Sequence, residues 1–150
     1  MIKIILTALS VLLIAIPVAA EEGVVTIPSN FSVEETADRM ENLLNTKGMT
    51  IFNRIKHSEG AANVGIELRK TELIIFGNPK VGSPLMKCQQ SVAIDLPQKA
   101  LIWEDADAKV WISYNDPVYL EKRHNIAGCE EVISKIKKAL SGITKSAAEE

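Results

Sequence analysis

Carboxylate side chains and a histidine in the second half of the chain are the groups whose chemistry could transfer protons. The candidates are Asp95, Glu104, Asp105, Asp107, Asp116 and His124. General acid–base catalysis commonly pairs a carboxylate with an imidazole, and an enzyme would use Asp116 and His124 as that pair. The chain contains no GxSxG, HExxH or glycine-rich phosphate-binding motif, so we expect binding rather than catalysis.

The chain has two cysteines, Cys88 and Cys129. We predict that they form a disulfide, which would close a loop of about 40 residues. Two buried free thiols are one alternative. A soft-metal or thiol redox protein is another, in which Met86 and His124 would supply further ligands. No CxxC, HxH or MxxM spacing supports that site, and we predict neither a bound metal nor a cofactor.

Apolar periodicity and capping signals indicate the elements that must position these groups. Ser32 and Glu35 form a capping box at the start of a helix that Gly48 ends. Asp116-Pro117 opens another helix, and apolar residues between Val132 and Leu140 form one stripe of a final helix. A short helix is expected over 81–89. Strands are expected over 24–27, 49–57, 71–76, 97–103 and 109–115, the last two joined by an acidic hairpin.

This order of elements predicts an α+β domain in which helices pack on one face of a largely antiparallel sheet. A chain of 150 residues with a net charge of −2 and no basic run is expected to form one domain that does not bind nucleic acid. The predicted domain covers 21–144, and a polar tail over 145–150 is expected to be flexible.

The first 20 residues are typical of a secretory signal peptide. Lys3 precedes an apolar run from Ile4 to Ile16, and Val18-Ala19-Ala20 supplies small residues for cleavage before Glu21. The alternative is an uncleaved anchor, but the run is short against the ~20 residues that a bilayer requires. We expect a periplasmic or secreted domain with no membrane contact after cleavage.

Several ordered motifs resemble the family called domain of unknown function 302. They are Gly77-Asn78-Pro79, Ala93-Ile94-Asp95-Leu96-Pro97, Ile102-Trp103-Glu104-Asp105, Ser113-Tyr114-Asn115-Asp116-Pro117 and Arg123-His124. The resemblance implies a TATA-binding-protein-like α+β fold with a curved antiparallel sheet, often in a homodimer. It implies neither DNA binding nor an assigned activity. Ala108 and Asn125 depart from the family, which often has glycine at both places.

The resemblance also suggests where a site would lie. The polar positions within its motifs are Asn78, Asp95, Glu104, Tyr114, Asn115, Asp116, Arg123 and His124. At the rim of a concave sheet, Arg123 and His124 could hold an anionic ligand. The alternative is structural, because Asp116 can cap a helix and Asn115 can form a turn.

The favoured interpretation is an exported binding or accessory module for a small ligand or a protein partner. We take all of these positions except Glu104 as its candidate ligand-binding residues. The alternatives are the soft-metal or thiol redox protein and the enzyme with an Asp/His pair.

Overall fold

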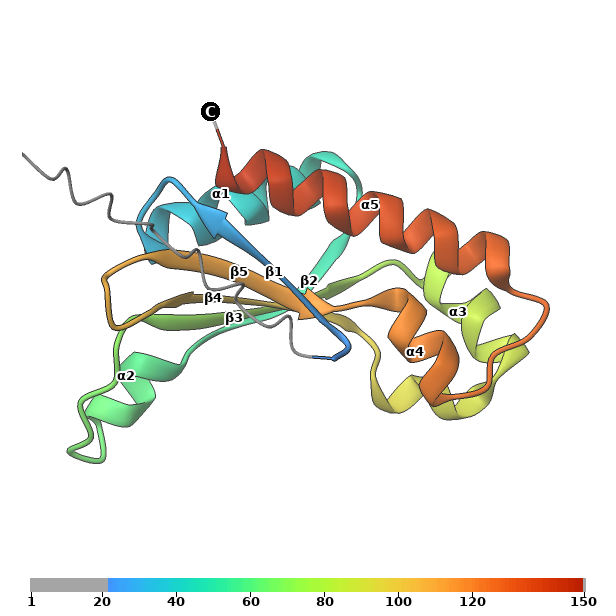
Figure 1. The fold of residues 1–150 in the computed structure, drawn as a ribbon, viewed down its shortest axis with the longest axis horizontal. Helices are drawn as coiled ribbons and strands as arrows, with labels where there is room; N and C mark the ends of the chain where they lie inside the picture. Colours follow the sequence, from blue (N-terminus) through green and yellow to red (C-terminus); the bar gives the residue numbers. More distant parts are fainter. Residues whose placement is uncertain (1–21, 150) are drawn as a thin grey trace, which may run out of the picture.

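The structure is a computed structural model that describes residues 22–149. These residues form an α+β domain with a five-stranded antiparallel sheet, in the order β1-β5-β4-β3-β2 (Figure 1). The strands are β1 (Val24–Ser29), β2 (Thr50–Lys56), β3 (Thr71–Gly77), β4 (Gln98–Glu104) and β5 (Val110–Asn115). The helices are α1 (Val33–Thr46), α2 (His57–Ala62), α3 (Pro79–Cys88), the 3₁₀ helix η1 (Gln90–Ile94), α4 (Pro117–Arg123) and α5 (Glu130–Ala148).

Capping residues begin the helices as the sequence predicts. The Ser32 side chain accepts a hydrogen bond from the Glu35 backbone N–H at the start of α1, and Asp116 caps α4 by accepting from Val118 N–H. Gly48, just beyond α1, has a φ of +67°, a left-handed conformation that glycine adopts without a steric penalty. These local contacts explain why both helices begin where they do.

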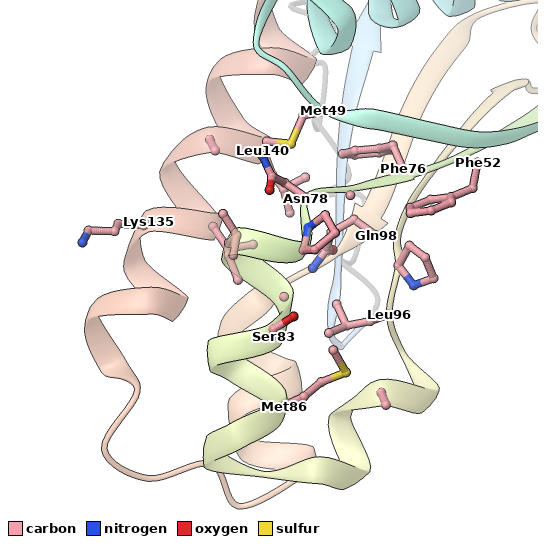
Figure 2. A pocket seen from close by; sticks show the side chains of 18 of the residues that line it. Met49, Phe52, Phe76, Asn78, Ser83, Met86, Leu96, Gln98, Lys135 and Leu140 are labelled. Atoms are coloured by element: carbon pink, nitrogen blue, oxygen red, sulfur yellow. The ribbon is translucent and has the colours of Figure 1, made fainter.

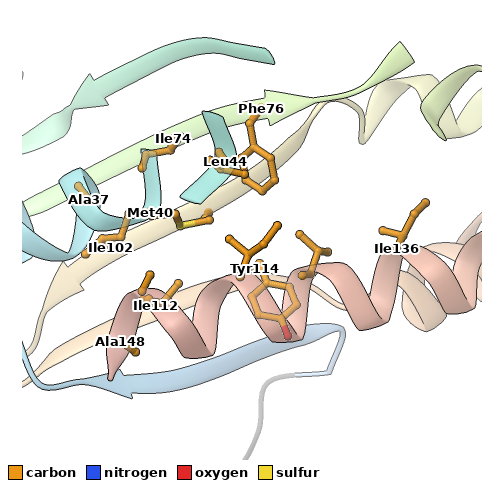
Figure 3. Close-up of a cluster of buried hydrophobic side chains, with 14 of the residues drawn as sticks. Ala37, Met40, Leu44, Ile74, Phe76, Ile102, Ile112, Tyr114, Ile136 and Ala148 are labelled. Carbon is orange, nitrogen blue, oxygen red and sulfur yellow. The ribbon is translucent and has the colours of Figure 1, made fainter. Parts of the chain in front are cut away.

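The hydrophobic core lies between one face of the sheet and the helices α1 and α5, which cover that face side by side (Figures 1 and 3). Ile74, Ile102 and Ile112 are fully buried at the centre of the sheet. Met40 of α1 and Ile143 of α5 are also fully buried. The predicted packing of helices on one face of an antiparallel sheet is therefore confirmed.

A charged network joins α1 to the sheet beside this core. Arg54 donates to Glu72, which is buried on β3, at 2.6 Å, and to Asp38 and Glu41 of α1 at 2.5 and 3.1 Å. Burial alone lowers the pKa of Arg54, but its hydrogen bonds with Asp38, Glu72 and Glu41 outweigh burial and raise that pKa above its usual value. Removing Arg54 would leave Glu72 as an uncompensated buried charge, so the network is structural.

The structure differs from the predictions in three places. The polar stretch after β2 contains the helix α2, which has no side-chain cap and buries no residue. No element was predicted for residues 90–94, which form η1. The predicted flexible tail is wrong for 145–148, because α5 continues to Ala148, which is buried and accepts from Asn30 N–H at 3.0 Å. The predicted signal peptide lies outside the described residues.

Candidate functional site

Three of the predicted site residues meet at one end of the sheet. His124 Nε2 lies 2.6 Å from Asp95 Oδ2, and Arg123 donates to Asp95 Oδ1 at 3.4 Å. Ser91 Oγ lies 3.1 Å from His124 Nδ1. We call Ser91, Asp95, Arg123 and His124 the Asp95 cluster.

The hydrogen bonds of the Asp95 cluster define the proton positions on the neutral imidazole. An ionised carboxylate can only accept, so Nε2 carries the proton that Asp95 receives. Nδ1 is then an acceptor, and the Ser91 hydroxyl donates to it. The imidazole is largely shielded, with an exposed side-chain fraction of 8%, whereas that of Arg123 is 49%.

Two short helices bring the Asp95 cluster together. Ser91 lies in η1, and Asp95 is the residue on which η1 ends. Arg123 is the last residue of α4, and His124 caps its C-terminus. The disulfide between Cys88 and Cys129 closes the same end of the molecule, because it joins the last residue of α3 to the N-cap of α5.

The predicted acid–base pair of Asp116 and His124 is not formed. Asp116 caps the N-terminus of α4 while His124 follows its C-terminus, so the whole helix separates them. The carboxylate partner of His124 is Asp95 instead.

The predicted site residues at the end of β5, just before α4, have structural roles. Tyr114 is buried on the helix-covered face of the sheet. Burial raises its pKa, and a hydrogen bond with Thr144 of α5 opposes that rise. Asn115 ends β5, and Asp116 caps α4. Neither Tyr114 nor Asp116 forms a hydrogen bond or ion pair with the Asp95 cluster.

Asn78 lies at a different feature, a cavity of about 430 Å³ between α3, α5 and the ends of β3 and β4 (Figure 2). Its carboxamide caps α3, accepting from Lys80 N–H at 2.9 Å and donating to the Gly48 carbonyl at 3.3 Å. It therefore shapes the cavity wall, and both of its polar groups are already engaged.

The cavity wall is mainly apolar. Apolar side chains from several elements line it: Met49, Phe52, Phe76, Val81, Met86, Leu96, Pro97, Ile136, Ala139, Leu140 and Ile143. Ser83 and Gln98 are polar exceptions within it. Lys135 of α5 also belongs to the lining, but its side chain points away from the other labelled residues (Figure 2). Volumes of roughly 300–1,000 Å³ with a few polar groups are typical of small-molecule sites.

Phe52 is the most unusual part of this wall. It lies where the pairing of β2 with β3 shifts register, and 54% of its surface is exposed. A bulge of this kind redirects a side chain. Here it leaves a large, exposed aromatic ring in the lining of the cavity.

The cysteines form the predicted disulfide. In this state neither sulfur is a thiolate, so the soft-metal alternative would first require reduction. Within residues 22–149, the structure contains no group of three or more His, Cys, Asp or Glu side chains placed to hold a metal ion.

The fold and the site define a small α+β domain with an apolar cavity and a separate polar cluster. A model of the family described as "Domain of unknown function DUF302" matches residues 25–143. The chain belongs to this family.

A solved structure supports the same fold. The crystal structure of an uncharacterized conserved DUF302 protein from Bacillus stearothermophilus superposes with a TM-score of 0.76 and 18% sequence identity. The match covers 85% of this chain and 99% of that one.

Two curated relatives are longer proteins. The chain is 42% identical over 129 residues to "Fluoride-specific ion channel FluC 1" of Brucella suis and of Brucella abortus. These matches cover 85% of this chain, but only 51% and 48% of the two relatives. The chain thus spans about half the length of the curated relatives it matches. Within residues 22–149, no helix has the length and apolarity needed to cross a membrane.

Sequence reasoning missed Ser91 and the cavity. Ser91 occurs in a polar stretch without a recognisable motif, and only its contact with His124, 33 residues further on, distinguishes it. Ile136, Ala139 and Leu140 were predicted to lie on the apolar stripe of the last helix, but apolar periodicity cannot show where packing is incomplete.

Proposed function

We propose that the domain binds a small, mainly apolar molecule in the cavity between α3, α5 and the sheet. The observation that carries this proposal is a volume of about 430 Å³ with an almost entirely apolar wall. This is the predicted binding module, with its site moved from the end of β5 to the cavity.

The polar groups in the cavity wall indicate which polar groups the ligand carries. Ser83 and Gln98 could accept or donate one or two hydrogen bonds. The Lys135 side chain points away from the cavity (Figure 2), but it is long and flexible and could turn its ammonium group toward an anionic end of the ligand. Lys135 is already 3.4 Å from Glu131, but both side chains are mostly exposed, so that pair is weak and easily exchanged. The flexible side chains of Met49 and Met86 would adapt to the apolar body.

A fluorescence titration with 1-anilinonaphthalene-8-sulfonate tests this proposal, because that probe combines an apolar body with one anionic group. We expect saturable binding to the folded protein that dodecanoate displaces. Ala139→Phe should fill the cavity and weaken binding by about tenfold or more, since a ring would occupy the ligand volume.

Lys138→Phe is the matched control, because residue 138 is exposed on the same helix. It adds the same ring outside the cavity and should leave the affinity unchanged. The proposal fails if the folded Ala139→Phe protein binds the probe as tightly as the wild type, or if the wild type shows no saturable binding.

We also propose that the domain acts outside the cytoplasm, after removal of residues 1–20. The disulfide supports this proposal, because disulfides persist mainly in oxidising compartments. Intact mass of the protein recovered from cells should correspond to a chain that begins at Glu21. A mass that includes Met1 would contradict export by cleavage.

A second candidate function is an accessory domain of a membrane channel. It is favoured by the relatives named as fluoride-specific ion channels, in which the match covers about half of the protein. A strain that lacks this chain should then grow less well in sodium fluoride, and expression of the chain should restore growth. Equal growth of the two strains in fluoride would exclude this role.

We further propose a homodimer formed through the sheet face that α1 and α5 leave uncovered. This face carries partly exposed apolar side chains, among them Leu73, Leu101, Trp103 and Trp111. Light scattering should give twice the monomer mass for the wild type and the monomer mass for Leu101→Lys. A monomeric wild type would refute this proposal.

A further inference from the structure

The Asp95 cluster contains a hydroxyl, an imidazole and a carboxylate joined in series. Ser91 Oγ lies 3.1 Å from His124 Nδ1, and His124 Nε2 lies 2.6 Å from Asp95 Oδ2. From this geometry we propose that Ser91 is a nucleophile, that His124 is its general base, and that the domain hydrolyses small carboxylic esters or thioesters. This activity goes beyond the proposed binding function and does not depend on the cavity.

The burial of the three groups suits these roles. Ser91 is exposed, so a substrate carbonyl can reach its oxygen. The side chains of His124 and Asp95 are only 8% and 11% exposed, so water competes little for their hydrogen bond. A nucleophilic serine requires such a base within hydrogen-bonding distance, itself oriented by a third group.

The proton positions are also correct for the first step. Because Asp95 accepts from Nε2–H, the Nδ1 lone pair of the neutral ring faces the Ser91 hydroxyl. Asp95 is a positioning residue in this scheme. It holds the tautomer that leaves Nδ1 free to receive a proton, and its negative charge stabilises the imidazolium that forms.

The reaction needs only the substrate and water. Ser91 Oγ bonds to the substrate carbonyl carbon while its proton moves to His124 Nδ1. The C–O or C–S bond of the leaving group then breaks, and the leaving group takes that proton. A water molecule attacks the acyl-serine and passes its proton to His124. The C–Oγ bond then breaks, Ser91 recovers the proton, and the carboxylic acid leaves.

Arg123, which binds the same Asp95 carboxylate, carries hydrogen-bond donors that the substrate could use. Among residues 22–149, the only hydrogen bond that its side chain makes is the one with Asp95 at 3.4 Å. About half of the side chain is exposed. A guanidinium has five N–H donors, so most of them are available to an oxyanion or to an acidic group on the substrate.

The experiment uses a fluorophosphonate probe, which forms a covalent bond with activated serines, followed by peptide mass mapping. We expect the folded wild type to be labelled at Ser91 and Ser91→Ala to be unlabelled. His124→Gln should slow labelling by about two orders of magnitude, the usual contribution of a general base. Hydrolysis of 4-nitrophenyl acetate should decrease in the same order.

Ser134→Ala is the control, because Ser134 is an exposed serine on α5. It should be labelled at Ser91 as fast as the wild type. Asp95→Asn tests the positioning role separately, since it should change the dependence of the labelling rate on pH while Ser91 remains the labelled residue. The proposal is overturned if the folded wild type is not labelled at Ser91, or if His124→Gln is labelled at the wild-type rate.

Discussion

The two ends of the sheet satisfy their polar groups in different ways (Figure 1). At the β4–β5 hairpin, Asp105 accepts from Asp107 N–H, Lys109 N–H and Trp111 Nε1–H. All of these partners lie within six residues of it in the chain. At the opposite end, Asp95 binds Arg123 and His124, which are 28 and 29 residues away. The disulfide there joins residues 41 positions apart.

The hairpin is therefore a local turn, whereas the opposite end is built from residues far apart in the sequence. Local hydrogen bonds require only that the hairpin form, so they stabilise it whatever the rest of the molecule does. The Asp95 cluster and the cavity exist only when η1, α3, α4 and α5 are all in place. Changes at the hairpin should therefore alter stability alone, whereas changes at the opposite end should alter stability and binding together.

The largest loss of stability is expected when the disulfide is removed. Replacing both cysteines in Cys88→Ala/Cys129→Ala should lower the free energy of unfolding by about 2–4 kcal/mol, because the unfolded chain is no longer constrained. Denaturant unfolding under oxidising conditions measures this loss.

The same variant should also bind the fluorescent probe more weakly, because the bond ties together the two helices that line the cavity. The wild type in reductant is the control and should lose a similar amount of stability. If the double variant and the reduced wild type both bind the probe with unchanged affinity, the disulfide does not affect binding in the cavity.

A smaller loss is expected from the Asp95 cluster. Asp95→Ala would leave the shielded Nε2–H of His124 without an acceptor, which costs about 1–3 kcal/mol. Thermal unfolding monitored by circular dichroism measures it. Ser91→Ala should cost much less, because Ser91 is exposed and its hydroxyl can be replaced by water. Equal losses for the two variants would contradict this order.

A gain of stability is expected at the hairpin. Ala108 has a φ of +58°, a left-handed conformation that costs a residue with a Cβ atom roughly 1–2 kcal/mol. Ala108→Gly should therefore raise the free energy of unfolding by up to about 1 kcal/mol, after the greater freedom of glycine in the unfolded chain is subtracted. Probe binding should stay unchanged.

Asn125, with a φ of +50°, provides the comparison at the other end. Asparagine tolerates this conformation better than alanine, so Asn125→Gly should gain less than Ala108→Gly. Denaturant unfolding of both variants tests the order. A larger gain at Asn125 would show that its strain is the greater.

The smallest effect is a pH dependence at the hairpin. The indole hydrogen bond from Trp111, followed by the backbone N–H of Lys109, lowers the pKa of Asp105 below its usual value. Because the folded pKa is lowered, the stabilisation is complete above the usual pKa of aspartate and is lost as the pH falls through the lowered value.

Tryptophan fluorescence of a Trp103→Phe variant, which leaves Trp111 as the remaining tryptophan, should show an acid transition below the usual aspartate range. Asp105→Asn should remove that transition. A transition that survives in Asp105→Asn would assign the pH dependence to another group.

Much of the fold could be read from short stretches of sequence. The capping box at Ser32, the Asp116-Pro117 helix start and the period-two strands depend on neighbours within a few residues, and each lies where it was expected. Motif resemblance correctly indicated the family, and the glycine preference at Ala108 and Asn125 matches their left-handed backbone. The helix α2 escaped prediction because it buries nothing and has no capping side chain.

The sequence by itself thus determined the order of the elements, the family and the position of the disulfide, because these follow from local backbone preferences, motifs and two cysteines. Only the tertiary structure decided the carboxylate partner of His124, the role of Ser91 and the presence of a cavity. The reason is physical. A hydrogen-bonded cluster and a cavity depend on how helices far apart in the sequence pack against one sheet. Apolar periodicity specifies which face is buried but not how completely that face is filled.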